Sequence, residues 1–368
     1  AIGDGTTYRN AWAVENDVIP GTAGNSCHVL FQLNAIVNAT EINGFTLTGG
    51  NACEWKAKAA GGAVYALGNV AIKACRVIEN SGYFKAQSIN DSNTYGGAIY
   101  LAGSGDATIS HCYFSSNYSH SSYGQGLGGA IYAKNVKIDN CEFFDCVGMD
   151  AGGAVFNENG TIDNCIFSNC YSASGGAVYN KGVASRLTIS NCSGLLGGGC
   201  FNSGTLSHTK VFNCYADAVE FGETLGGQGG GVFSADGQVV GCVVYNNQSF
   251  RGGGIYLRGG KVVNSTVQNN MLRAESDTAN IGLFVPQLAA SVLNTIGNPD
   301  AAATNFVKPS TFKGVSLAGT PVELIEANWA LAAGSEFIDK GTLTPGIEEA
   351  TDMAGNARVM GSSIDVGA

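Results

Sequence analysis

Charged residues, proline and long apolar runs are all scarce in this sequence of 368 residues. Charged side chains make up 13% of the chain, about half of the usual share. The six prolines argue against a disordered chain rich in proline and glycine. No apolar run reaches the ~18 residues of a membrane-spanning helix, so we expect no transmembrane segment. Residues 1–10 lack the charged start and apolar core of a signal peptide, and we expect none there.

Basic residues are outnumbered, and the formal net charge is −10. A chain without a basic patch cannot neutralise phosphates, which excludes nucleic acid and an anionic membrane surface as expected partners. The 12 cysteines form an even number, which in a secreted protein can indicate a disulfide framework. The positions of these cysteines favour another explanation.

Glycine is abundant, with 54 residues, and much of it occurs in a repeat. The pattern glycine-glycine-small-aliphatic-aromatic recurs with a shortest spacing of ~23 residues, and longer spacings are consistent with insertions into the same unit. It begins at Gly61, Gly96, Gly128, Gly152, Gly175, Gly197, Gly229 and Gly252. The chain is therefore predicted to be a repeat protein.

A second landmark, a small and mildly apolar side chain, follows each glycine pair. It is found at Cys75, Cys112, Cys141, Cys165, Cys192, Thr209, Cys242 and Ser265. Five positions further on the sequence has Asn80, Asn117, Cys146, Cys170, Cys214, Asn247 and Asn270. We expect the repeat at Cys192 to be contracted, because it breaks this offset.

The residue before each landmark belongs mostly to the types that tolerate a left-handed backbone. These residues are Ala74, His111, Asn140, Asn164, Asn191, His208, Gly241 and Asn264. They predict one sharp turn per repeat, and stacked asparagines can form hydrogen bonds along such an array. His111 and His208 are therefore interpreted as turn residues.

The segments beside the turns alternate in polarity with the period of a half-buried strand. Val136 and Ile138 are predicted to face inward, and Lys137 and Asp139 outward. A repeat of ~23 residues accommodates three short strands and three turns, with coils stacked ~4.8 Å apart. We predict an all-β, single-stranded parallel β-helix of about nine coils. An antiparallel hairpin architecture would instead place turns every 8–12 residues or so.

The repeats define the expected domains. Residues 1–37 are predicted to cap one end, residues 38–271 to form the β-helix repeats, and residues 272–368 to form a last irregular coil and a C-terminal cap, because a solenoid needs its open core covered. Within that cap, four charged residues are interpreted as polar latches: Asp339, Asp352, Arg358 and Asp365.

The insertions fall between the second landmark and the next glycine pair, so they are expected to emerge from one corner of the coils. Loops gathered on one face of a solenoid are often its binding surface. The candidate ligand-binding residues on this face are Trp55, Tyr83, Tyr95, Tyr118, His120, Tyr123, Tyr215, Glu220, Phe221 and Glu223. Their aromatic rings suit sugars or protein partners. Alternatively, the rings fold back and seal the coil surface.

Catalytic and metal sites have weak signals. The chain has no Asp-Asp pair and only scattered acids in its coils, whereas glycoside hydrolysis needs two nearby carboxylates. Asp139 and Asp163 occupy equivalent positions on adjacent coils. They are either solvated turn residues or a stacked pair of carboxylates that could bind a cation. No Cys-x-x-Cys spacing occurs, so no metal site and no cofactor are predicted. Stacked cysteines lie within bridging range, but their parallel side chains would strain a disulfide, so we expect mostly free, buried thiols.

Several motifs resemble those of known bacterial surface proteins. The Gly-Gly-Ala-Val/Ile-Tyr repeats, followed by Phe-x-x-Asn, are similar to the repeats of polymorphic outer-membrane proteins. The C-terminal segments resemble a choice-of-anchor Q region, and the start resembles the N-terminal motif of such proteins. The residues that carry this resemblance are Phe114–Asn117, Ala333–Gly341, Asp352–Arg358, Ile364–Ala368 and Gly3–Ala11.

The resemblance implies a right-handed, pectin lyase-like β-helix, export, and a location outside the cell or on the bacterial outer-membrane surface. A sorting or anchoring segment would normally follow the last motif, and we expect none within this chain. The predicted function is a non-catalytic, adhesin-like or glycan-binding scaffold, whose partner is a polysaccharide or a host or cell-surface glycoprotein. The alternatives are a polysaccharide lyase or glycoside hydrolase acting on the coil surface, and a structural spacer.

Overall fold

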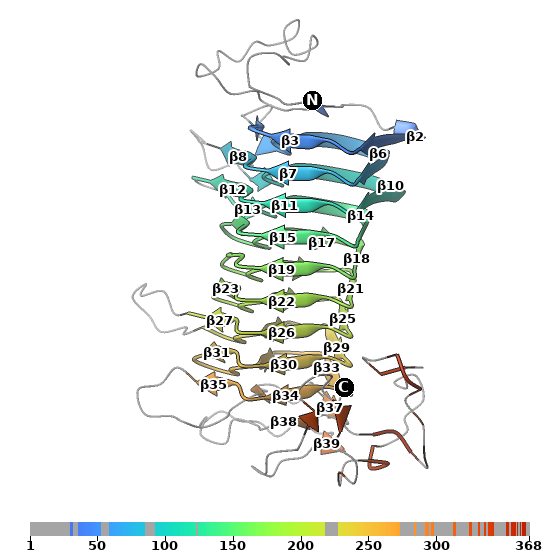
Figure 1. The fold of residues 1–368 in the computed structure, drawn as a ribbon. Coiled ribbons are helices and arrows are strands. Elements are labelled where there is room, and N and C mark those ends of the chain that lie inside the picture. The colour runs from blue at the N-terminus through green and yellow to red at the C-terminus, as the bar shows by residue number, and fades with distance from the viewer. Residues whose placement is uncertain are drawn as a thin grey trace, which may run out of the picture. The chain divides into compact units, whose positions relative to one another are not determined.

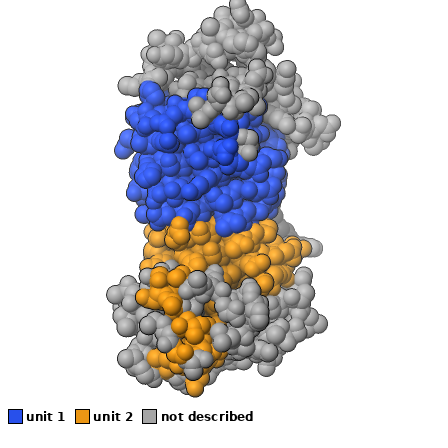
Figure 2. Space-filling view, turned by 90° about the vertical axis from the view of Figure 1, so that its right-hand side faces the viewer, with its two compact units in different colours: residues 1–183 blue, residues 184–368 orange. Residues whose placement is uncertain are grey.

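The structure is a computed structural model in which the chain divides into two compact units, residues 1–183 and 184–368, coloured blue and orange in Figure 2. It describes residues 30–31, 36–52, 59–84, 93–122, 124–217, 227–272, 283–284, 291–293, 296–297, 312–313, 324–325, 330–331, 335, 338–341, 351–352, 355–357, 359, 361 and 363–365. All elements in these residues are strands, and none of them is a helix that could span a membrane. Most of the predicted N-terminal cap, residues 1–37, lies outside the described residues, and the predicted domain boundaries remain predictions.

Unit 1 consists of parallel sheets in which each strand pairs with the equivalent strands of the preceding and following coils (Figure 1). A long sheet contains β1 (Leu30–Phe31), β2 (Ile36–Asn43), β6 (Val64–Lys73), β10 (Ile99–Ser110), β14 (Ile131–Asp139), β17 (Val155–Glu158), β18 (Thr161–Asp163) and β20 (Val178–Asn180). A middle sheet contains β3 (Thr46–Thr48), β7 (Arg76–Ile78), β11 (Tyr113–Ser115), β15 (Glu142–Phe144) and β19 (Ile166–Ser168).

Two further sheets of unit 1 have shorter strands. The first, called the short sheet here, contains β4 (Asn51–Ala52), β8 (Ser81–Phe84), β12 (Tyr118–Ser121) and β16 (Val147–Gly148). The other contains β5 (Ala59–Ala60), β9 (Thr94–Tyr95) and β13 (Gly126–Leu127). The predicted coil of parallel strands is therefore confirmed.

Unit 2 repeats this arrangement. Its long sheet contains β24 (Cys200–Asn202), β25 (Thr205–Ser207), β28 (Val232–Ser234), β29 (Gln238–Val240), β32 (Ile255–Leu257), β33 (Lys261–Val263), β36 (Leu283–Phe284), β37 (Ser291–Leu293) and β39 (Phe312–Lys313). Its middle sheet contains β22 (Thr188–Ser190), β26 (Lys210–Phe212), β30 (Val243–Tyr245), β34 (Thr266–Gln268) and β38 (Ile296–Gly297). Its short sheet contains β23 (Ser193–Gly194), β27 (Tyr215–Ala216), β31 (Gln248–Ser249) and β35 (Met271–Leu272), and β40 (Leu324–Ile325) pairs with β41 (Ala330–Leu331) in antiparallel. The remaining strand, β21 (Val183–Ser185), spans the boundary between the two units.

The middle strands position the core because only their central residue faces inward. In unit 1, Phe114, Phe143 and Phe167 are aligned by the strand register and are fully buried. Their rings stack with centroids 4.7 Å apart at each step. Burying a side chain of this size contributes about 1.5–3 kcal/mol to stability.

Each coil turns at the left-handed residue that the sequence predicts. Seven of the eight predicted residues occupy this first corner, between the long and middle sheets: Ala74, His111, Asn140, Asn164, His208, Gly241 and Asn264, with φ between 47° and 60°. A second left-handed corner, which the sequence analysis did not identify, precedes the short sheet. It contains Glu79, Ser116, Asp145, Asn169, Asn191, Asn213, Asn246 and Asn269.

The prediction for the repeat at Cys192 is wrong. Cys192 connects β22 to β23 just as Cys214 connects β26 to β27, so both belong to the second landmark, and Asn191 belongs to the second corner. The first landmark of this coil is Leu187, whose backbone N–H donates to Thr209 Oγ1 at 3.2 Å. Because Arg186 takes the left-handed turn there (φ 53°), neither residue matched the expected types, although the offset of five is kept.

The glycine pair has two separate functions. Gly96 takes a left-handed conformation with φ +67°, which an L side chain rarely adopts. Gly97 is required for close packing, because a Cβ atom there would lie 2.2 Å from the carbonyl oxygen of Gly129 on the next coil. The repeated Gly-Gly therefore marks both a turn and a close approach of adjacent coils.

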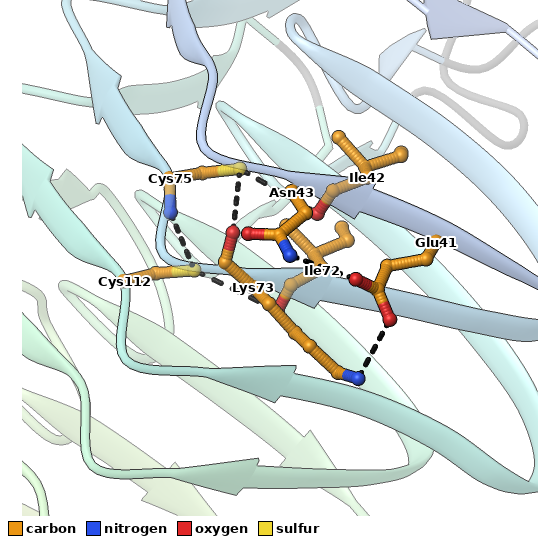
Figure 3. Close-up of polar contacts among 7 residues, drawn as sticks. All are labelled: Glu41, Ile42, Asn43, Ile72, Lys73, Cys75 and Cys112. Carbon is orange, nitrogen blue, oxygen red and sulfur yellow. Dashed lines mark hydrogen bonds and ion pairs between the residues drawn. The ribbon is translucent and has the colours of Figure 1, made fainter.

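The cysteine landmark forms a chain of hydrogen bonds along unit 1. The backbone N–H of Cys75 donates to Cys112 Sγ at 3.4 Å, and that of Cys112 donates to Cys141 Sγ at 3.5 Å. The backbone N–H of Cys141 donates in turn to Cys165 Sγ at 3.4 Å. Figure 3 shows the first of these contacts beside the ion pair of Glu41 with Lys73. All ten cysteines of the described residues, including Cys242 in unit 2, are buried thiols outside any disulfide, as predicted.

Candidate functional site

Three of the predicted loop residues come together on the outer face of the short sheet in unit 1. Tyr83 lies on β8, Tyr118 and His120 lie on β12, and Tyr83 is the register partner of His120. The Tyr83 and His120 rings stack with centroids 5.6 Å apart, and the Tyr118 ring is tilted against His120 at 6.0 Å. The alternation of the strand turns these side chains outward, while Gly82 and Ser119 point inward. We call these three residues the aromatic patch.

The aromatic patch offers both ring surface and polar atoms. Tyr83 is 42% exposed, and its hydroxyl lies 3.2 Å from Ser122 Oγ. Burial raises the pKa of Tyr118, and the nearby Tyr83 raises it further, so the Tyr118 hydroxyl remains protonated at neutral pH. His120 Nδ1 is buried without a hydrogen-bond partner in the described residues, while the backbone carbonyl of His120 accepts a 2.8 Å bond from Thr94 Oγ1. Such a surface can pack against a sugar ring and form hydrogen bonds with its hydroxyl groups.

Other exposed aromatic residues lie on the short sheets. Tyr171 is 38% exposed and bridges to Val147 of β16, which itself pairs with β12. In unit 2, Tyr215 of β27 is 46% exposed, as predicted for a residue at the start of an insertion. Because the strands before the insertions belong to this sheet, each unit presents its insertion loops from the end of its short sheet.

Tyr95 is a predicted site residue that performs a sealing role instead. Its ring packs edge-on against Tyr132, with centroids 5.0 Å apart, and against Tyr100 at 6.2 Å. Tyr100 and Tyr132 belong to a stack of outward-facing rings on the long sheet. Since these rings cover one another face to face, they expose mainly edges, and a sugar cannot stack between them.

The remaining candidates cannot be placed. Trp55, Tyr123, Glu220, Phe221 and Glu223 lie outside the described residues. Their membership of a binding face stays a prediction.

A charged group that the sequence analysis missed lies on the long sheet of unit 1. The Tyr132 hydroxyl donates to Glu158 Oε2, and Lys134 Nζ lies 3.3 Å from Glu158 Oε1. Partial burial raises the pKa of Glu158, but the bonds from Tyr132 and Lys134 and the charge of Lys181 outweigh it and hold that pKa below its ordinary value. Burial raises the pKa of Tyr132 well above the usual range for a tyrosine, with Glu158 adding to the effect. The repeat spacing could have shown part of this group, because Lys134 and Glu158 occupy equivalent positions of adjacent coils.

The acidic residues singled out in the sequence lie in two places, on the strands of the long sheet and in the C-terminal region. Asp139 and Asp163 are register partners on adjacent coils, as predicted. Among the described residues, no three His, Cys, Asp or Glu side chains are grouped closely enough to hold a metal ion. In the C-terminal region, Asp339 N–H donates to Asp365 Oδ1 at 2.8 Å, and Asp339 Oδ1 accepts from Ser363 N–H at 3.1 Å.

A further C-terminal contact involves Asp352. Its carboxylate accepts bonds of 2.8 and 3.0 Å from the backbone and side chain of Asn356. These carboxylates accept bonds from nearby backbone groups, and their role as latches of a cap stays a prediction; Arg358 lies outside the described residues.

The stacked parallel strands and their left-handed corners define the class of a parallel β-helix. A family model for a right-handed β-helix region matches residues 13–216, more than half of the chain, and the chain belongs to this family. Among solved structures, the crystal structure of pectate lyase Pel9A is similar over 88% of this chain and 86% of that chain, with 14% sequence identity and a TM-score of 0.41. A search of curated proteins finds no match.

Proposed function

We propose that this protein is a non-catalytic, exported or surface-displayed β-helix that binds a glycan at the aromatic patch. The carrying observation is that Tyr83, Tyr118 and His120, separated by insertions in the sequence, gather on one outward face with Tyr83 42% exposed. An exposed aromatic ring can pack against the apolar face of a sugar, and the nearby hydroxyl groups can form hydrogen bonds with the sugar hydroxyls. The polymorphic outer-membrane protein-like repeats and the choice-of-anchor Q-like region support export and surface display as part of this proposal.

The aromatic patch also suits a repeating ligand. Tyr118 and Val147 occupy neighbouring rungs of the short sheet, and Tyr171 bridges to Val147, so outward side chains follow one another at the ~4.8 Å spacing of parallel strands. A polysaccharide lying along the coils of unit 1 would contact several rungs in turn. Many weak contacts of this kind give an adhesin useful avidity.

An enzymatic alternative is supported by the Tyr132–Glu158–Lys134 group. A tyrosine hydroxyl bonded to a carboxylate beside a lysine contains the residue types of acid–base chemistry on a uronate, which suits a lyase. Tyr132 is only 8% exposed, however, and its ring is covered on both faces by Tyr100 and Phe156. This packing favours a structural role for Tyr132.

A polysaccharide panel tests these functions together. The protein is incubated with acidic and neutral polysaccharides, and new reducing ends and the ultraviolet absorbance of unsaturated products are measured. Retention of the protein on each polysaccharide is measured in parallel. Retention without cleavage, lost in the variant Tyr83→Ala, is the expected result. Cleavage of any substrate would overturn the non-catalytic function, and retention of nothing would leave a structural spacer.

A further inference from the structure

A second surface feature of unit 1 lies on different strands from the aromatic patch. A groove of about 360 Å³ runs along the bend between the two halves of the long sheet. Its polar lining comes from β14 and from the turn and strand of the following coil: Asn135, Lys137, Asn159 and Thr161. All four side chains are exposed. At one end the groove reaches Gly105, in the irregular segment of β10.

The groove holds side-chain donors at fixed positions. Lys137 and Thr161 are register partners on β14 and β18, so their side chains project from the same face on adjacent rungs. Asn135 and Asn159 are both in the left-handed conformation, with φ 54° and 62°. The lining therefore contains two amide groups, a hydroxyl and an ammonium group.

Charges of both signs lie around the groove, because the register partners Asp139 and Asp163 follow Lys137 and Thr161 on the same strands. Lys134 is paired with Glu158, and Lys181 lies 5.0 Å from the Phe156 ring. Within the described residues of unit 1, Lys137 forms no ion pair, which leaves its ammonium group available to a ligand. Asp106 follows Gly105 in the chain, is exposed, and can accept hydrogen bonds from hydroxyl groups.

We propose that this groove binds the anionic group of an acidic saccharide, either a carboxylate or a sulfate, with Lys137 and Thr161 holding the anion. The amides of Asn135 and Asn159 and the carboxylate of Asp106 then bind sugar hydroxyl groups. A volume of about 360 Å³ suits one or two sugar residues. The groove is independent of the aromatic patch, so its failure leaves the proposed function standing.

Asparagine is also a common left-handed turn residue, and a purely structural role for Asn159 must be separated from a binding role. The variant Asn159→Gly keeps the turn conformation and removes only the amide group. Lys137→Gln removes the charge and keeps an extended polar side chain. Lys73→Gln is the matched control, because it changes the net charge equally but lies in the Glu41 ion pair outside the groove.

Calorimetric titration tests the proposal with three tetrasaccharides: one carrying carboxylates alone, one carrying carboxylates and sulfates, and one neutral. We expect the acidic tetrasaccharides to bind and the neutral one not to bind, with affinity falling as salt is added. Lys137→Gln and Asn159→Gly should each weaken binding at least fivefold, with unchanged melting temperatures, and Lys73→Gln should not. Equal binding of the two acidic tetrasaccharides would indicate a general anion site. Tighter binding of one of them would show which anionic group, carboxylate or sulfate, the groove prefers.

Three results would overturn the site. These are equal binding of neutral and acidic tetrasaccharides, no binding of either acidic form at millimolar concentration, and undiminished binding by Lys137→Gln. The variant Tyr83→Ala separates the two surfaces: binding lost with Tyr83→Ala but kept with Lys137→Gln would place the acidic saccharide on the aromatic patch instead.

Discussion

The side-chain oxygen of Asn117 accepts two hydrogen bonds from Asn80 on the preceding coil, one from the backbone N–H at 3.0 Å and one from Nδ2 at 3.1 Å. Asn117 Nδ2 in turn donates to the carbonyl oxygen of Val77 at 2.8 Å. Both asparagines are 1% exposed. One buried amide thus satisfies three groups at the second corner, where the chain leaves the middle sheet and its backbone groups need other partners.

Replacing Asn117 with Ala should lower the free energy of unfolding by about 2–4 kcal/mol, because it removes the acceptor of the buried Asn80 backbone N–H and the bonds to Asn80 Nδ2 and the Val77 carbonyl. Chemical denaturation measures this loss. Asn140→Gly is the matched control: it removes an asparagine from the first corner but keeps the left-handed turn, so its effect should stay within about 0.5 kcal/mol. Similar effects for the two variants would argue against a special role for the buried ladder.

The buried thiols should be inert in the folded protein. A hydrogen bond with the Cys141 thiol and burial raise the pKa of Cys112 to about 12, and burial raises that of Cys146 far above its usual value. Thiols this hard to ionise are poor nucleophiles. We expect a thiol reagent at pH 8 to leave all ten described cysteines unmodified in the native protein.

The same reagent should modify all ten described cysteines in denaturant without any reductant. Thiols that appear only after reduction would show that the stacked cysteines form disulfides in the isolated protein. Rapid modification of any of these ten cysteines in the native protein would mean that the coils open far more often than the buried core indicates.

Much of the coil could be predicted because its corners restrict residue type. Left-handed backbone favours Gly and Asn, so His111, Asn140 and Asn164 marked the first corner correctly. Arg186 and Leu187 escaped detection because neither has the expected residue type. The surrounding coils impose the left-handed turn on Arg186, and they accommodate Leu187 where other coils have a small landmark residue. The second corner was missed in the first coils because Glu79 and Ser116 carry no such signature, although five later coils have asparagine there.

The candidate site was less predictable because it depends on register between distant strands. Tyr83 and His120 are separated by 37 positions that include an insertion, and only strand pairing shows that they stack. The buried pair Asn157 and Asn180, whose side chains are joined by a 2.9 Å hydrogen bond, was also missed. Its position holds Ala133 in the preceding coil, but a buried polar residue recurs there, with Asn202 and Ser234 as register partners in unit 2, so aligning the repeats could have shown it.

Glu158 should contribute to stability only when it is ionised. Its pKa is lowered in the folded protein, so its contribution is present above its ordinary value of 4.5 and is lost as the pH falls through the lower folded value. At pH 7, Glu158→Gln should lower stability by about 0.5–1 kcal/mol. This difference from the wild type should shrink towards zero below pH 4, as measured by thermal unfolding across the pH range.

Glu142→Gln is the charge-matched control for this experiment, because Glu142 is exposed on β15 and forms no ion pair in the described residues. Its melting temperature should follow that of the wild type at every pH. A difference between Glu158→Gln and the wild type that persists at pH 3 would mean that the side chain acts through packing instead of charge.

Tyr83 and Tyr95 allow binding to be separated from folding, because both lie in the predicted loop face and only one is exposed as part of the aromatic patch. Tyr83→Ala should reduce retention on a bound glycan at least fivefold and leave the melting temperature nearly unchanged, since its ring is 42% exposed. Tyr95→Ala should lower stability by about 1–3 kcal/mol, because it removes edge-on packing against Tyr100 and Tyr132. Its glycan retention, measured below its melting temperature, should match the wild type. The reverse pattern would assign the ligand to the ring stack on the long sheet and remove the aromatic patch from consideration.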